Sequence, residues 1–131
     1  MKIKMIALTG ALALAAFASV GAAQLTDQDK QFLTKYDKVH HALVADDLAG
    51  AKAAAKDLGG DGSEIANSSS LKDARAGFEK LSSRAKTLAA GGNGYHVMHC
   101  PMLKKDWVQT SDKVENPYGG KEMLTCGEMK K

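Results

Sequence analysis

Six side chains that could bind one soft metal ion lie close together near the C-terminus of this 131-residue chain. Two short segments carry them, residues 96–102 (HVMHCPM) and residues 123–126 (MLTC). The candidate ligands are Cys100, Met102, Met123, Cys126, His96 and Met98. Thiolate, thioether and imidazole groups are the ligands that Cu(I) selects. The cluster therefore predicts a metal site with Cu(I) as the suspected cofactor.

The spacing of these residues indicates how they would meet. If residues 96–102 are extended, alternation places His96, Met98, Cys100 and Met102 on one face of the strand and turns Val97 and His99 away. In the second segment, the methionine and the cysteine are three residues apart, so one helical turn would bring them side by side. Cys100 and Met102 would be the central ligands, joined by Met123 and Cys126, with His96 or Met98 completing the set.

A second interpretation of the same residues is a disulfide in a small apolar core. Two cysteines in an exported protein pair more often than they bind metal. A bridge between Cys100 and Cys126 would close a loop of about 27 residues and contribute roughly 3–4 kcal/mol. The methionines would then fill gaps in the core, as methionine commonly does. The residues alone leave both interpretations open.

The other two histidines, His40 and His41, are adjacent in a segment with helical periodicity. His40 lies at the margin of the apolar stripe of that segment, and His41 faces outward. We expect a structural role for this pair.

The N-terminus has the composition of a secretory signal peptide. Lys2 and Lys4 precede a mostly apolar stretch at residues 6–20, which is followed by small residues at 21–23. The stretch is too short for a membrane span, and no later segment resembles one. We therefore expect cleavage after Ala23, export to the periplasm, and no membrane insertion of the mature protein.

Composition restricts the function of the remaining 108 residues. They suffice for one small domain, residues 24–131, and their formal charge is about +1. The sequence has no basic stripe with interleaved aromatic residues, so a nucleic-acid partner is not expected. We also predict that the protein is not an enzyme, because no cofactor motif accompanies the adjacent His99 and Cys100 and no third residue is seen to orient that histidine.

Three segments of residues 24–90 show the periodicity of amphipathic helices. The first spans residues 26–45 with Thr26 as its N-cap, and the second follows Asp46 and Asp47 as far as Leu58. The third begins at Ser70 and ends at the glycines of residues 91–94, and the polar residues 61–70 indicate a loop with one helical turn near Ile65. We predict an up-down helical bundle.

Residues 95–131 follow a different pattern, with both prolines and the only tryptophan of the chain. We expect residues 95–100 to be extended and Pro101 to end that stretch. Tyr95, Trp107 and Tyr118 should supplement the thin, alanine-rich core of the bundle. The predicted fold class is therefore all-α: an up-down bundle of three or four helices with an irregular, Cys/Met-rich C-terminal cap.

Several C-terminal motifs also resemble a bacterial family of exported domains of unknown function. The motifs are, in order, Cys-Pro-Met at residues 100–102, Trp107, Asn-Pro-Tyr at residues 116–118 and Met-Leu-Thr-Cys-Gly at residues 123–127. The segment at residues 42–48 (ALVADDL) extends the similarity upstream. Domains of this family occur alone and at the C-terminus of copper and silver efflux adaptors of the membrane-fusion type. The resemblance implies metal handling and an envelope efflux adaptor as a partner.

Together these observations favour one function and leave one alternative. The favoured function is a periplasmic soft-metal binding protein that acts as a chaperone, a buffer or an accessory to heavy-metal efflux. The alternative is a non-metal periplasmic interaction module stabilised by a Cys100–Cys126 disulfide.

Overall fold

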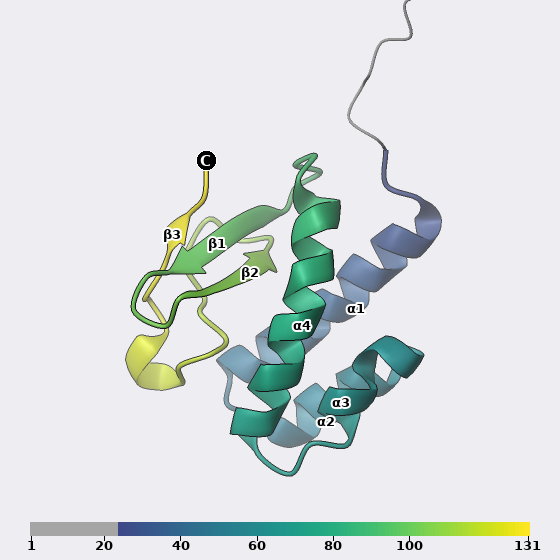
Figure 1. Ribbon diagram of the computed structural model, residues 1–131, viewed down its shortest axis with the longest axis vertical. Coiled ribbons are helices and arrows are strands. Elements are labelled where there is room, and N and C mark those ends of the chain that lie inside the picture. Colours follow the sequence, from purple (N-terminus) through teal and green to yellow (C-terminus); the bar gives the residue numbers. More distant parts are fainter. Residues whose placement is uncertain (1–23) are drawn as a thin grey trace, which may run out of the picture.

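The computed structural model describes residues 24–131, and the predicted signal peptide lies outside this range. Helices form the first part of the described chain and an antiparallel sheet forms the second (Figure 1). In chain order the elements are α1 (Asp27–Val44), α2 (Leu48–Lys56), the 3-10 helix η1 (Gly59–Gly62), α3 (Ser63–Ala66), α4 (Leu71–Ala89), β1 (His96–Cys100), β2 (Lys105–Gln109), the 3-10 helix η2 (Lys121–Met123) and β3 (Glu128–Met129).

The helices begin where the sequence predicts them. Thr26 caps α1 in a reciprocal capping box with Asp29, in which each side chain accepts a hydrogen bond from the backbone N–H of the other. The Asp47 side chain accepts from Gly50 N–H at the start of α2, and the Ser70 side chain accepts from Asp73 N–H at the start of α4. The predicted helical turn near Ile65 is α3.

The all-α prediction is wrong, because the C-terminal segment is not an irregular cap. Its strands form a three-stranded antiparallel sheet in the order β2-β1-β3, which packs against α4 through β2 (Figure 1). The turn after Pro101 includes Lys104 at φ 54°, and it returns the chain so that Met98 pairs with Trp107. Residues 95–100 were predicted to be extended, and His96–Cys100 form β1. A strand is stable only with a partner, however, and that pairing is not visible in local periodicity.

The core joins the helices to the sheet through aromatic rings. Phe78 of α4 stacks on Tyr36 of α1 with ring centroids 4.6 Å apart, and it also contacts Tyr118 with ring centroids 5.8 Å apart. Trp107 of β2 meets Tyr118 edge to face at 6.2 Å. All four rings are buried, which confirms that aromatic residues of the C-terminal segment complete the alanine-rich core.

A chain of buried hydroxyl groups covers the free edge of β2. Val108 N–H donates to the Tyr36 hydroxyl at 3.1 Å, and Ser82 Oγ lies 2.7 Å from Tyr36 and 2.9 Å from the Tyr118 hydroxyl. Tyr118 donates to the Asp106 carbonyl at 2.8 Å, since a carbonyl oxygen can only accept. Each hydroxyl then donates one hydrogen bond and accepts one. The chain runs from Val108 N–H through the hydroxyls of Tyr36, Ser82 and Tyr118 to the Asp106 carbonyl.

This arrangement of donors and acceptors requires that Tyr36 and Tyr118 both keep their hydroxyl protons. Burial raises the pKa of both tyrosine hydroxyls well above their ordinary value, so both keep the proton that they must donate. The chain satisfies an N–H and a C=O of an edge strand that no neighbouring strand reaches.

We predict that Tyr118→Phe lowers the free energy of unfolding by about 1–3 kcal/mol, because it leaves the Asp106 carbonyl buried without a donor. Urea denaturation of the oxidised protein measures this change. Tyr95→Phe is the matched control, since Tyr95 is only partly buried and outside the hydroxyl chain. The double variant Tyr36→Phe/Tyr118→Phe should lose less than the sum of the single losses, because both residues belong to one network. Equal stability of the Tyr118→Phe and Tyr95→Phe proteins would contradict the role of the chain.

Candidate functional site

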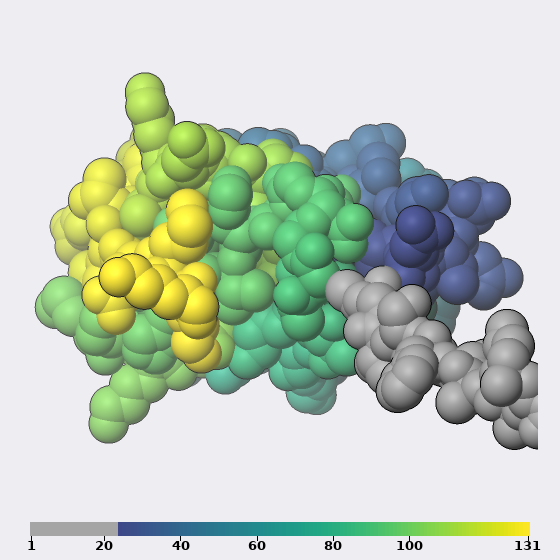
Figure 2. All heavy atoms as spheres, turned by 90° about the horizontal axis from the view of Figure 1, so that it is seen from above, coloured from purple at the N-terminus to yellow at the C-terminus, as the bar shows by residue number. Residues whose placement is uncertain are grey.

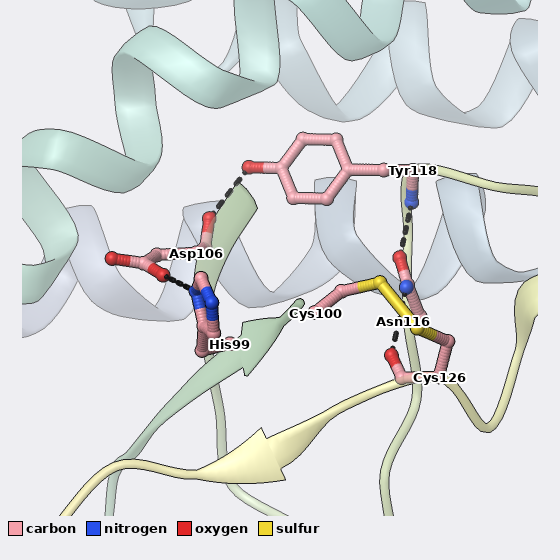
Figure 3. Close-up of a disulfide and its surroundings, with 6 residues drawn as sticks. All are labelled: His99, Cys100, Asp106, Asn116, Tyr118 and Cys126. Carbon is pink, nitrogen blue, oxygen red and sulfur yellow. Dashed lines mark hydrogen bonds and ion pairs between the residues drawn. A yellow bond between two sulfur atoms is a disulfide. The ribbon is translucent and has the colours of Figure 1, made fainter. Parts of the chain in front are cut away.

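The two cysteines of the predicted metal site form a disulfide (Figure 3). Cys100, at the end of β1, is fully buried, and its Cα atom lies 5.5 Å from that of Cys126. The bridge ties the end of β1 to the turn that follows η2, where Cys126 N–H donates to the Met123 carbonyl at 2.9 Å. In this form neither sulfur is a thiolate, which is the species that binds metal.

The other predicted ligands lie in different surroundings. Met98 is buried, and Met123 packs partly buried against the same hydrophobic core as the disulfide. Met102 is 75% exposed, because β1 ends at Cys100 and the next residues form a turn. The His96 imidazole Nε2 is 4.0 Å from a carboxylate oxygen of Asp112. The structure thus brings Met98 and Met123 into the core that contains the disulfide and leaves Met102 in solvent.

Asp106 is the centre of an ionic cluster that the sequence analysis missed. Its Oδ1 lies 2.6 Å from Nδ1 of His99, which is on the face of β1 opposite Cys100 (Figure 3). Its Oδ2 accepts from Lys86 of α4 at 2.8 Å and from Lys130 at 3.1 Å. Partial burial by itself raises the pKa of the Asp106 carboxyl. The hydrogen bonds from Lys86, His99 and Lys130 outweigh burial and hold that pKa well below its ordinary value.

Around this cluster lies a cleft of about 220 Å³ between α4 and the sheet. We call it the lysine cleft, since four lysines line it: Lys86, Lys104, Lys105 and Lys130. Only two carboxylates face them, those of Asp106 and Glu79, and Glu79 forms an ion pair with Lys105. The cleft is therefore a positively charged hollow that brings together α4, the β1–β2 turn and the end of the chain.

The lysine cleft has no signature in the sequence. Lys86 is 20 residues from Asp106, and Lys130 is 24 residues away on the other side. The one local signal is the run Lys104-Lys105-Asp106, which reads as an ordinary solvated turn. The pairing of β1 with β2 is what places His99 opposite Asp106.

The loop between β2 and β3 is irregular but held by side chains. The Gln109 amide accepts from Trp107 Nε1 at 2.8 Å and donates to the carbonyls of Ser111 and Lys113, each at 2.6 Å. The Asn116 amide donates to the Cys126 carbonyl at 2.9 Å and accepts from Tyr118 N–H at 2.8 Å (Figure 3). Buried amides thus replace regular pairing and hold the disulfide in place.

Within residues 24–131, one group of histidine and aspartate side chains is close enough to share a cation. It consists of Asp37, His40 and His41 on α1, whose potential ligand atoms all lie within 4.8 Å of one another. His40 is completely buried. The structural role that the sequence predicts for this histidine pair stays a prediction.

No protein-family model, no curated protein and no solved structure matches this chain. The resemblance to the exported domain family of efflux adaptors accordingly stays a prediction. None of the helices in residues 24–131 is both long enough and apolar enough to cross a membrane.

We predict that Asp106→Asn makes the protein less stable at neutral pH and flattens its loss of stability in acid. The pKa of Asp106 is lowered in the folded state, so its contribution is complete above its ordinary value of 3.8 and disappears as pH falls through the folded value. The loss at pH 7 should be on the order of 1–2 kcal/mol, because charge-assisted hydrogen bonds at a partly screened site are lost. Denaturation curves between pH 2 and pH 7 measure both effects.

The control for this prediction is Asp112→Asn, which removes a carboxylate that is 93% exposed. It should leave the pH dependence of stability unchanged. A parallel pH profile for the Asp106→Asn and wild-type proteins would show that Asp106 does not carry the acid sensitivity.

Proposed function

We propose that this chain is a non-catalytic periplasmic interaction module that binds an acidic segment of an envelope protein in its lysine cleft. The observation that carries the proposal is the excess of lysine over carboxylate around that cleft. Lys86 and Lys130 share a single acceptor, Asp106, and Lys105 is paired with Glu79. Lys104 is exposed and forms no ion pair with any residue between 24 and 131.

The chemistry of the cleft favours a protein partner. Carboxylates of an incoming peptide can pair with Lys104 and displace the shared ion pairs of Lys86 and Lys130, which gives orientation and a fast association rate. The cleft lining contains no Phe, Tyr or Trp ring on which a base could stack, its one aromatic ring being the His99 imidazole that is bonded to Asp106, and the mature chain is nearly neutral overall. The neighbouring turn adds the exposed Met102 as an apolar contact.

The proposed location and partner have separate support. The disulfide is consistent with an oxidising compartment, and the predicted signal peptide leads to the periplasm. The resemblance to domains attached to efflux adaptors makes such an adaptor the proposed partner. The hydroxyl chain attaches β2 to α4, and the disulfide ties the end of β1 to the turn after η2, which together support a preformed docking surface.

We predict that Lys104→Glu/Lys105→Glu weakens binding of fluorescent poly-L-glutamate about tenfold at low salt, because surface ion pairs contribute on the order of 0.5–1 kcal/mol each. Fluorescence anisotropy measures the affinity. The control Lys56→Glu/Lys72→Glu changes the net charge equally at exposed positions. Lys72 is also far from the lysine cleft, since it precedes Lys86 on α4 by 14 residues, or about 21 Å along the helix. Equal loss in both double variants would reduce the effect to net charge and contradict a docking site.

Soft-metal binding by the reduced protein is the second proposal, and the position of the cysteines favours it. Their Cα atoms are 5.5 Å apart, so two thiolates freed by reduction can bind one Cu(I) ion. Met98 and Met123 pack in the same core and can supply thioether ligands. In this proposal the oxidised form is the closed state of the site, and reduction opens it.

We predict that anaerobically reduced protein competes with a chromogenic chelator for Cu(I) and that oxidised protein does not. Cys100→Ser should weaken Cu(I) binding most, because thiolate is the strongest soft ligand in the set. Met123→Ala should weaken it less, and Met102→Ala least, since Met102 extends into solvent. Circular dichroism of the reduced protein checks that the fold is retained. Equal Cu(I) binding by the oxidised and reduced forms would exclude the thiols as ligands.

A further inference from the structure

One face of α1 carries three side chains that can bind a metal through nitrogen and oxygen. Asp37, His40 and His41 follow the spacing of three and four residues that places side chains together on a helix. His41 Nε2 is 3.3 Å from Asp37 Oδ2. This group contains no sulfur and belongs to an element that carries neither cysteine.

The hydrogen bond made by His40 determines which of its ring nitrogens is free. Nε2 lies 2.7 Å from the backbone carbonyl of Glu115. A carbonyl oxygen accepts only, so Nε2 carries the proton, and in the neutral imidazole Nδ1 then has a lone pair. Nδ1 is buried and has no hydrogen-bond partner within residues 24–131. A histidine held by a carbonyl through one nitrogen while the other faces a metal is the usual arrangement of a metal ligand.

Asp37 and Glu115 also each have a buried carboxylate oxygen, Oδ1 and Oε2 respectively, without a hydrogen-bond partner in the described part of the chain. Carboxylate oxygens and the unprotonated Nδ1 are all acceptors, so they cannot satisfy one another. The negative charges of Asp37 and Glu115 both act on the His40 ring. A bound cation would coordinate buried lone pairs, whose burial without a partner otherwise destabilises the folded protein.

The group is open to solvent, and its potential ligand atoms lie close together. The side chain of His41 is 56% exposed and that of Asp37 is 24% exposed, so an ion can enter from solvent. Ligand atoms around a tetrahedral zinc ion are about 3.3 Å apart, given metal–ligand distances of about 2.0–2.1 Å. Asp37 Oδ2 and His41 Nε2 are 3.3 Å apart, and one ring nitrogen of each histidine and one carboxylate oxygen of Asp37 lie within 4.8 Å of one another.

We propose that Asp37, His40 and His41 form a binding site for a divalent transition-metal ion of the Zn²⁺ type. Two imidazole nitrogens and one carboxylate oxygen are a set that suits Zn²⁺ and Cu²⁺ and disfavours Mg²⁺ and Ca²⁺. Three protein ligands leave a fourth position for water or for a group from a partner. The site is independent of the disulfide and of the lysine cleft. Through Glu115, a bound ion would also reinforce the contact between α1 and the loop that follows β2.

The test uses oxidised, chelator-treated protein, so that the thiols cannot contribute. Titration with ZnCl2 should show saturable one-to-one binding in calorimetry and raise the melting temperature, because the ion binds only the folded site. Asp37→Asn and His41→Ala should each weaken Zn²⁺ binding at least tenfold. Both side chains are partly exposed, so these variants keep the fold, whereas His40→Ala would leave a cavity in the core.

His96→Ala is the matched control, since His96 is likewise a partly exposed histidine near an aspartate. It should bind Zn²⁺ as the wild type does. Nitrogen NMR gives a second readout: without metal, His40 should carry its proton on Nε2, and Zn²⁺ should shift the Nδ1 signal. Absence of saturable binding, equal weakening by His96→Ala, or unchanged affinity in Asp37→Asn and His41→Ala would each overturn the proposal.

Discussion

The attachment of the sheet to the helices depends on the hydroxyl chain of Tyr36, Ser82 and Tyr118. The chain begins at Val108 N–H and ends at the Asp106 carbonyl, so both of its ends are backbone groups of β2. An edge strand with unpaired backbone groups would otherwise have to face water or another chain. Because the three hydroxyls come from α1, α4 and the loop after β2, one network joins all the layers of the domain. Figure 2 shows the resulting arrangement, with α4 between the start of α1 and the yellow C-terminal segment.

The position of the lysine cleft follows from this attachment. Holding the backbone of Asp106 against Tyr118 directs its side chain toward α4, where Lys86 reaches it. The cleft then lies along the seam between a helix and a sheet, where groups distant in sequence converge. The disulfide closes the opposite side of the same layer, so the sheet is held by hydroxyl groups on one side and by sulfur on the other. A surface held in this way loses little conformational freedom on binding.

The chain separates two classes of possible metal ligand. Of the candidate sulfur ligands, Met98 and Met123 lie in the core that contains the disulfide, and the two cysteine sulfurs become thiolates only after reduction. The nitrogen and oxygen ligands gather on α1, where buried lone pairs are present in either redox state. Soft ions such as Cu(I) prefer the sulfur groups, whereas borderline ions such as Zn²⁺ also bind imidazole nitrogen and carboxylate oxygen. The two proposed metal sites therefore differ in ligand type and in their dependence on redox state.

Local signals in the sequence predicted the helices and their first residues. Thr26, Asp47 and Ser70 act through hydrogen bonds to residues three positions away, so their effect is visible in a short window. The extended segment before Pro101 was also visible from its alternation, and the even cysteine count made a disulfide one of two interpretations. The spacing of Asp37, His40 and His41 was present in the sequence, but it is common on helix surfaces and carries little information alone.

Tertiary structure decided the rest, because the decisive contacts join residues that are far apart in the chain. The pairing of β1 with β2 turned an expected cap into a sheet, and it placed His99 against Asp106. Met98 lies within β1 and is buried, whereas Met102 is in solvent because β1 ends at Cys100 and a turn follows, although alternation in the sequence treats the two residues alike. The contact between His40 and Glu115 spans 75 residues. The sequence determines which hydrogen bonds and metal contacts each side chain is able to make. Only the folded chain determines which of these groups come close to one another and are buried away from water.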